Sequence, residues 1–98
     1  MNVYSMPNCE SSIVYILEDD NTVYIDSIFT PYEHRNKGYG SNVLNSFLSE
    51  YLPYVDVTLL ASPILGFSIN RVVNWYKRHG FVEVKSNSFG VEMICKKL

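Results

Sequence analysis

The sequence predicts a mixed α/β fold, an α+β arrangement built around one mixed sheet. Short runs rich in β-branched and aromatic residues indicate strands, and two other segments repeat their apolar residues with the period of a helix. The predicted order of elements is β-β-(β)-α-β-α-β-β. A chain of 98 residues can bury one hydrophobic core but not two, so residues 1–98 are expected to form a single domain.

The first third of the chain predicts a β-hairpin. Residues 12–17 and 22–29 are rich in β-branched and aromatic side chains, and the turn-forming residues 18–21 separate them. A short strand around Val3 to Ser5 is expected to precede the hairpin.

The rest of the chain predicts two helices separated by a strand. Apolar residues recur at helical spacing from Val43 to Leu52, and Pro53 halts that helix. Residues 55–61 predict a strand, and residues 62–67 a loop.

A second helix and two closing strands follow. Ser68 or Asn70 can cap the helix, and Gly80 ends it. Strands are expected near residues 81–85 and 91–96, around a turn.

Charge is distributed unevenly along the chain. The formal net charge is −2, which argues against a protein that coats DNA or RNA. Residues 1–34 carry six acidic side chains and no Lys or Arg, whereas residues 35–98 carry all eight Lys and Arg and four acidic side chains. The unevenness either separates an anion-binding half from a region that attracts cations, or arises by chance on a small surface.

Cysteine spacing and hydropathy predict the compartment. Cys9 and Cys95 lie far apart, without a C-x-x-C pair or a His cluster, so neither a metal site nor a disulfide framework is expected. The N-terminal residues do not resemble an export signal, and no window of about 18 apolar residues occurs. A reduced, cytoplasmic protein that does not enter a membrane is expected.

The segment after the hairpin favours anion binding. Residues 35–40, Arg-Asn-Lys-Gly-Tyr-Gly, open the first predicted helix. Glycines let backbone N–H groups approach an anion, the helix N-terminus adds a partial positive charge, and Arg35 and Lys37 add full charges. The other interpretation is an ordinary glycine-rich turn with solvated basic side chains.

Other nucleotide and nucleic-acid motifs fit this segment less well. The P-loop spacing is absent, and a dinucleotide-binding G-x-G-x-x-G would need its third glycine at Val43. Residues 37–40 match the start of the RNP1 strand of RNA-recognition modules, but Ser41 and Asn42 miss its next positions. An RNA-binding module is kept as an alternative.

Two segments together resemble the GCN5-related N-acetyltransferase (GNAT) family. The strand ending at Phe29 and the sequence R-x-x-G-x-G at residues 35–40 are similar to the family's acetyl-CoA motif at a strand-to-helix junction. Residues 73–81 resemble its second motif, an amphipathic helix that ends in Y-x-x-x-G-F. The resemblance covers residues 12–98.

This resemblance implies a GNAT-like acyl-CoA N-acyltransferase fold that lacks the family's N-terminal strand-helix-helix. About a dozen residues precede the hairpin, too few for the helices that wall the acceptor site in the family. Small, truncated versions of this type resemble acetyltransferases of phages and mobile elements, including one that acetylates a CRISPR nuclease.

The same resemblance implies acetyl-CoA as the cofactor. Backbone N–H groups of the glycine turn would bind its diphosphate, and the strand at residues 22–29, splayed from the strand at 55–61, would hold the acyl arm. The implied cofactor-binding residues are Phe29, Thr30, Arg35, Asn36, Lys37, Gly38, Tyr39, Gly40 and Ser41.

Two catalytic residues are expected from the resemblance. Tyr76 corresponds to the general acid that protonates the departing thiolate, although it also lies on the apolar stripe and could be core packing. Asp26 is the candidate base, acting directly or through water, with Glu33 and His34 as rivals; a solvated acidic face is the alternative for all three.

Other residues are assigned structural roles. His79 is expected to serve the C-terminus of the second helix, Trp75 the core or an interface, and both cysteines strand packing.

The function implied is transfer of acetyl from acetyl-CoA to a primary amine, in a ternary complex and without a metal. The acidic first third favours a cationic acceptor: a protein lysine, an N-terminal amine or a small polyamine. A reduced acceptor wall favours a macromolecular substrate or a homodimer that completes the site. A non-catalytic acyl-CoA-binding regulator is the second alternative.

Overall fold

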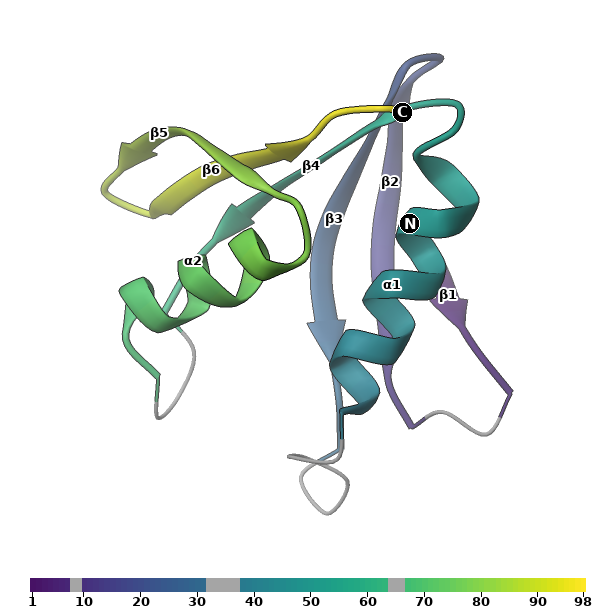
Figure 1. Ribbon diagram of the computed structural model, residues 1–98, viewed down its shortest axis with the longest axis horizontal. Coiled ribbons are helices and arrows are strands. Elements are labelled where there is room, and N and C mark those ends of the chain that lie inside the picture. The colour runs from purple at the N-terminus through teal and green to yellow at the C-terminus, as the bar shows by residue number, and fades with distance from the viewer. Residues whose placement is uncertain (8–9, 32–37, 64–66) are drawn as a thin grey trace.

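The computed structural model describes residues 1–7, 10–31, 38–63 and 67–98. The elements formed by these residues follow the predicted order (Figure 1): β1 (Asn2–Ser5), β2 (Ser12–Asp19), β3 (Thr22–Phe29), α1 (Tyr39–Tyr51), β4 (Asp56–Ala61), α2 (Ile69–Arg78), β5 (Val82–Asn87) and β6 (Gly90–Cys95). The mixed α/β prediction is confirmed, and the short strand expected around Val3 is present as β1.

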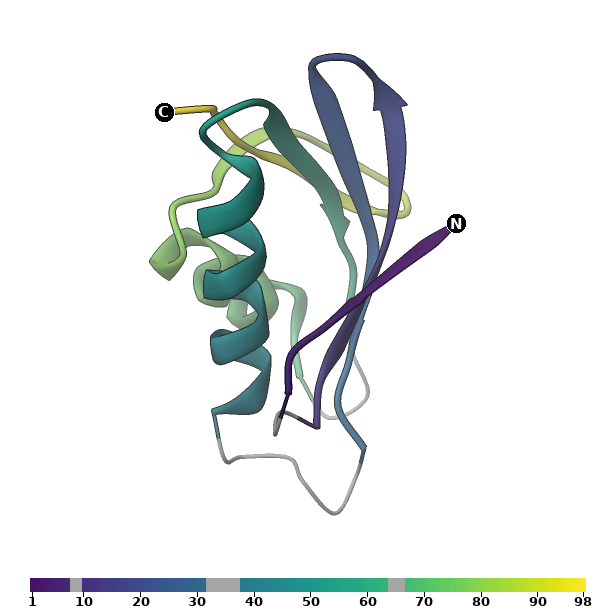
Figure 2. The ribbon, with the colours of Figure 1, turned by 90° about the vertical axis from the view of Figure 1, so that its right-hand side faces the viewer.

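All these strands form one sheet in the order β1-β2-β3-β4-β6-β5. β3 and β4 are parallel neighbours, and the other neighbouring pairs are antiparallel. Both helices lie on the same face of the sheet (Figure 2). Buried side chains of that face and of the helices form one core, including Ile13, Ile25, Val57, Leu59 and Phe81. The opposite face carries no helix in the described part of the chain.

β3 and β4 pair along only part of their length. Thr22–Ile25 pair with Asp56–Leu59, whereas β3 stays paired with β2 as far as Phe29. Within the described residues, the edge of β3 that faces β4 therefore has no strand beside it from Asp26 onward, and Figure 1 shows the two strands diverging there. The splay implied by the family resemblance is present.

α1 is built on the predicted apolar stripe. The ring of Phe47 is fully buried and contacts the rings of Tyr4, Tyr15 and Tyr51 at centroid distances between 4.6 and 5.3 Å. The hydroxyls of Tyr15 and Tyr51 lie 2.8 Å apart and hydrogen-bond to each other. This aromatic cluster fixes α1 against β1 and β2.

The bounds of α1 exclude one alternative. The helix begins at Tyr39 and ends at Tyr51, two residues before Pro53. An RNP1 motif needs extended backbone where this helix runs. The interpretation of residues 37–40 as the start of an RNA-recognition strand is therefore wrong.

α2 has both predicted end signals. Ser68 is the N-cap, and its Oγ accepts a hydrogen bond from the Arg71 N–H at 3.3 Å. Of the two candidate caps, Ser68 rather than Asn70 takes the role. Lys77 lies in the last turn, and Gly80 follows with a positive φ that ends the helix.

The connection between β1 and β2 is short. Only residues 6–11 separate β1 from β2, which leaves no room between them for the pair of helices that the family carries ahead of its hairpin. None of the helices formed by the described residues is long and apolar enough to cross a membrane.

Candidate active site

The N-terminus of α1 places the backbone amides of Gly40 and Ser41 beside Gly38. Gly38 has φ +80°, a conformation that favours glycine, and no described residue lies within 4 Å of where its Cβ would be. The first helical hydrogen bond runs from Asn42 N–H to the Gly38 carbonyl at 3.0 Å. Among the described residues, the N–H groups of Gly40 and Ser41 therefore have no acceptor.

This turn has the features of a general anion-binding site. None of the described side chains caps the helix, and its first turn holds no acidic residue that would repel an anion. Free N–H groups at a helix N-terminus are a general anion site. Of the predicted cofactor residues, Tyr39 lies in this turn too. Arg35, Asn36 and Lys37 lie outside the described residues, as do Glu33 and His34.

The end of β3 meets this turn. Phe29 is the last residue of β3 and pairs with Ser12 of β2. The Oγ1 of Thr30 lies 2.5 Å from the Oγ of Ser11, which is 2% exposed. A Cβ built at Gly40 would lie 3.9 Å from that same Thr30 oxygen. The structure thus brings the strand end and the glycine turn together.

Asp26 lies at the point where β3 leaves β4. In the β2–β3 register, Tyr15 pairs with Ile25 and Val14 with Ser27, so Asp26 is an extra residue that forms a β-bulge. Its side chain is exposed. A β-bulge changes the direction of a strand locally. Here the change occurs at Asp26, where the pairing of β3 with β4 has just ended among the described residues.

Tyr76 projects from α2 between two aromatic rings. Its ring lies 5.1 Å from that of Trp75 and 5.6 Å from that of Phe81. Its hydroxyl has no hydrogen-bond partner among the described residues. Burial raises the pKa of Tyr76 from 10.0 to about 12. The phenol therefore stays protonated at neutral pH and is chemically able to donate a proton.

α2 also touches the first turn of α1. A Cβ built at Gly40 would lie 3.7 Å from Cζ2 of Trp75. His79 Nδ1 lies 2.8 Å from the Trp75 carbonyl oxygen, and its Nε2 lies 3.1 Å from Ser41 Oγ. The role expected for His79 at the end of its own helix is present, but the ring also bridges to α1.

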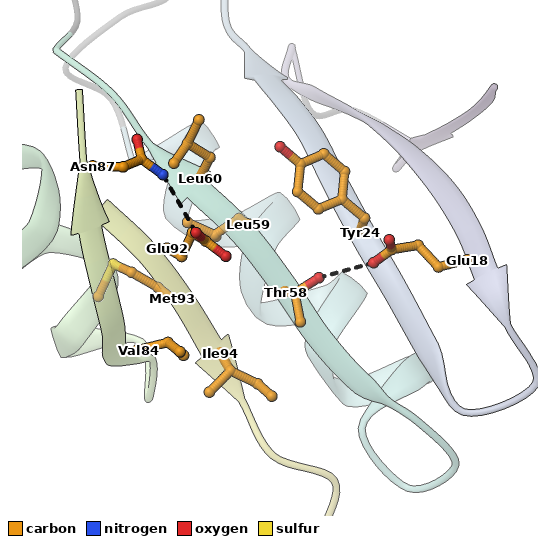
Figure 3. A pocket seen from close by; sticks show the side chains of 10 residues that line it. All are labelled: Glu18, Tyr24, Thr58, Leu59, Leu60, Val84, Asn87, Glu92, Met93 and Ile94. Carbon is orange, nitrogen blue, oxygen red and sulfur yellow. Dashed lines mark hydrogen bonds between the residues drawn. The ribbon is translucent and has the colours of Figure 1, made fainter. Parts of the chain in front are cut away.

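An open groove of about 520 Å³ lies on the helix-free face, across β3, β4 and β6 (Figure 3). Tyr24 and Thr58 point into it because they alternate with core residues along their strands. Thr58 donates a hydrogen bond to Glu18 Oε1 at 3.3 Å. Across the groove, Glu92 lies 3.5 Å from the Lys85 ammonium.

Carboxylates act on the Tyr24 hydroxyl in this groove. Burial raises the pKa of Tyr24 above its usual value, and the carboxylates of Asp26, Glu18 and Glu92 raise it further. Figure 3 shows the Tyr24 ring leaning from β3 toward β4, above Glu18. Carboxylates from β2, β3 and β6 thus act on the Tyr24 hydroxyl, close to where β3 and β4 diverge.

Cys95 is a packing residue, as expected. It is buried and unbridged, and burial raises the pKa of its thiol. Cys9 lies outside the described residues. The described residues contain no group of three or more His, Cys, Asp or Glu side chains able to hold a metal ion.

Sequence reasoning missed several of these features. The spacing of Trp75 and His79, four residues apart, places both on one face of α2, but it does not indicate the bridge from His79 to Ser41. The Ser11–Thr30 contact and the groove have no local sequence signal, because they join strands that are distant in the chain.

Comparisons with known proteins identify structures that share this fold. No protein-family model matches the sequence, and a comparison with curated proteins finds no match. Solved structures do match. A GNAT-family acetyltransferase from Bacteroides thetaiotaomicron aligns with a TM-score of 0.70 and 22% identity, over 90% of this chain and 55% of that chain. The PaiA N-acetyltransferase from Thermoplasma acidophilum, in complex with coenzyme A, aligns with a TM-score of 0.66 and 14% identity, over 90% and 53%.

A smaller structure matches along nearly its whole length. The anti-CRISPR protein AcrVA5 aligns with a TM-score of 0.69 and 20% identity, over 95% of this chain and 95% of that chain. The chain thus spans little more than half of the two larger acetyltransferases and almost all of the small protein. It has the fold of the GCN5-related N-acetyltransferases.

Proposed function

We propose that the chain is an N-acetyltransferase that moves acetyl from acetyl-CoA to a primary amine of a protein, a lysine side chain or an N-terminus. One observation carries the proposal: β3 leaves β4 after Ile25 and Leu59, and its far end lies close to the N-terminus of α1, where no described side chain caps the helix. An extended acyl arm fits the strand edge, and a diphosphate fits the helix end.

The main chain does most of the cofactor binding in this proposal. The amides of Gly40 and Ser41 hold the diphosphate, and Arg35 and Lys37 add charge. Main-chain groups at Phe29 and Thr30 hold the acyl arm and polarise its carbonyl. Coenzyme A supplies an activated thioester, and the protein orients it.

Tyr76 is proposed as the general acid. As the C–S bond of the thioester breaks and the new C–N bond forms, the Tyr76 hydroxyl gives its proton to the departing sulfur. Its protonated state at neutral pH supports this role, as does its hydroxyl, which has no hydrogen-bond partner among the described residues.

Asp26 is proposed as the base that takes a proton from the acceptor ammonium, directly or through water. Its exposed position at the β-bulge, where the splay begins, supports the role. Asp26→Asn should lower turnover and change the shape of the pH–rate profile. A profile that Asp26→Asn leaves unchanged would assign the proton transfer to another group.

The acceptor is proposed to approach through the groove of Figure 3. The groove reaches the splay from the side opposite the helices, and its carboxylates attract an ammonium. An open groove with no covering helices in the described chain suits a macromolecular acceptor, or a homodimer in which the second copy completes the wall.

Release of free thiol tests the activity. Purified protein with acetyl-CoA and a lysine-bearing protein acceptor should release coenzyme A, and the acceptor should gain the mass of one acetyl group. Thermal stabilisation by acetyl-CoA without thiol release or acceptor acetylation would instead identify a non-catalytic acyl-CoA-binding regulator.

The acceptor itself is best sought by intact mass in a cytoplasmic protein mixture. The extent of the match to AcrVA5 favours including CRISPR nucleases in that mixture, as acceptors for a phage-like enzyme. Small polyamines are the comparison substrates, and turnover of free amines equal to that of proteins would contradict a macromolecular acceptor.

A further inference from the structure

The first turn of α1 is held from the side by α2. Trp75 and His79, one helical turn apart, both contact this turn: the indole packs at Gly40, and the imidazole reaches Ser41. The Trp75 and His79 rings also contact each other in a tilted arrangement, with centroids 4.5 Å apart and planes inclined by 46°. The two segments that resemble separate family motifs therefore form one contact.

The hydrogen-bond chemistry fixes the tautomer of His79. Its Nδ1 faces the Trp75 carbonyl at 2.8 Å, and because a carbonyl oxygen only accepts, Nδ1 must carry the hydrogen. In the neutral ring Nε2 is then an acceptor, and the Ser41 hydroxyl donates its hydrogen to it at 3.1 Å. The ring thus links its own helix to α1 by two directed bonds.

This link bears on the amides that face the proposed diphosphate. A serine hydroxyl in the first turn of a helix can itself accept hydrogen bonds from nearby backbone N–H groups. At Ser41 the hydrogen bond to His79 fixes the position of the hydroxyl, and the amides of Gly40 and Ser41 have no acceptor among the described residues. The His79 ring therefore holds the Ser41 side chain on the side of α2.

We infer that His79 is a positioning residue for coenzyme A: through Ser41 it holds the first turn of α1 in the geometry that binds the diphosphate. The inference rests on the proposed function, because it assumes that this turn binds coenzyme A. It adds a residue from α2 that acts on the anion site without touching the reacting atoms.

Two amide substitutions at His79 distinguish its bond to Ser41 from its bond to the Trp75 carbonyl, which caps its own helix. In His79→Asn the amide lies where Nδ1 does and keeps the bond to the Trp75 carbonyl, but it is too short to reach Ser41. In His79→Gln the amide extends to the position of Nε2 and reaches Ser41. The two variants share chemistry and charge and differ in which bond they keep.

The measurement is the Kd of coenzyme A, alone, by isothermal titration calorimetry. His79→Asn should bind coenzyme A about 3- to 10-fold more weakly than the wild type, the range expected for one hydrogen bond. His79→Gln should stay within about twofold. In acetyl transfer, His79→Asn should raise the KM for acetyl-CoA and leave kcat unchanged.

A double-variant cycle gives a second readout. Ser41→Ala should weaken coenzyme A binding, and adding His79→Asn to it should weaken binding no further, because both changes remove the same contact. Additive losses, or equal Kd values for His79→Asn and the wild type, would overturn the inference. A wild-type protein that binds no coenzyme A would overturn the proposed function instead, so the two failures are distinguishable.

Discussion

Gly90 lies directly against the main chain of Ala61. A Cβ built at Gly90 would be 2.2 Å from the Ala61 carbonyl oxygen, and Gly90 has φ +151°, which side chains rarely adopt. The clash is with backbone on a neighbouring strand, so neither partner can move aside without disturbing the β4–β6 pairing.

Gly90→Ala should therefore destabilise the protein by about 2 kcal/mol or more, from strain and lost strand pairing. Urea denaturation measures the loss. Ser88→Ala in the same turn is the matched control and should change stability by less than about 0.5 kcal/mol. Equal stability of the two variants would mean that the turn relaxes freely.

Substitution of Gly38 is expected to lower stability for a different reason. There is open space for a Cβ in the described structure, so the cost of Gly38→Ala is backbone strain alone, about 1 to 2 kcal/mol at φ +80°. Gly38→Asn should cost less, because asparagine tolerates this conformation. Coenzyme A affinity, measured by calorimetry, should fall in the same order. Identical stability and affinity for Ala and Gly would show that the turn does not need this conformation.

Tyr76→Phe should lower turnover about 100-fold or more if the hydroxyl is the general acid. The phenylalanine ring keeps the contacts with Trp75 and Phe81, so coenzyme A binding should not change. Thiol release at saturating acetyl-CoA measures the effect. A loss of less than about threefold would leave Tyr76 as a packing residue only.

The same hydroxyl predicts a dependence of stability on pH. The pKa of Tyr76 is raised to about 12 in the folded protein against 10.0 as the model value, so folding favours the neutral phenol. Its contribution is fully present below pH 10 and is lost as the pH rises through 12, by about 2 to 3 kcal/mol. Urea denaturation at pH 9, 10, 11 and 12 should show a shallower decline for Tyr76→Phe than for the wild type. Some decline should remain in that variant, because the pKa values of Tyr24 and Tyr51 are raised as well.

Glu18→Gln tests the acidic groove. The substitution keeps the size of the side chain and its hydrogen bond from Thr58 but removes the charge. We expect kcat/KM for lysine-bearing acceptors to fall about two- to fivefold at low salt, with a smaller difference at high salt. Glu50→Gln, an exposed α1 residue away from the groove, is the charge-matched control. The same change in both variants would point to the net charge of the protein rather than to the groove.

Local signals in the sequence predicted the elements well. The apolar stripe before Pro53, the Ser68 cap and the glycine after α2 all act within a few residues, which is why the helices lie where they were expected. β2 runs two residues beyond its predicted end at Leu17. There Glu18 is skipped in the β2–β3 register, an irregularity that hydrophobic alternation does not encode.

Long-range features were not predictable in the same way. The pairing of β4 with β6, the bulge at Asp26 and the bridge from His79 to Ser41 all depend on how distant segments meet. The sequence analysis named His79 and Ser41 separately, each for its own reason. Only the fold shows that their side chains form a hydrogen bond. Arg35, Asn36 and Lys37 stay predictions.

The partial pairing of β3 with β4 divides the sheet into two three-stranded halves, joined in register only over Thr22–Ile25 and Asp56–Leu59. A ligand bound where β3 and β4 diverge would replace the hydrogen bonds that the two strands do not make there. It would therefore couple the two halves of the sheet mechanically. Amide hydrogen exchange along residues 26–29 should then slow on ligation, and the two halves should melt as one cooperative unit.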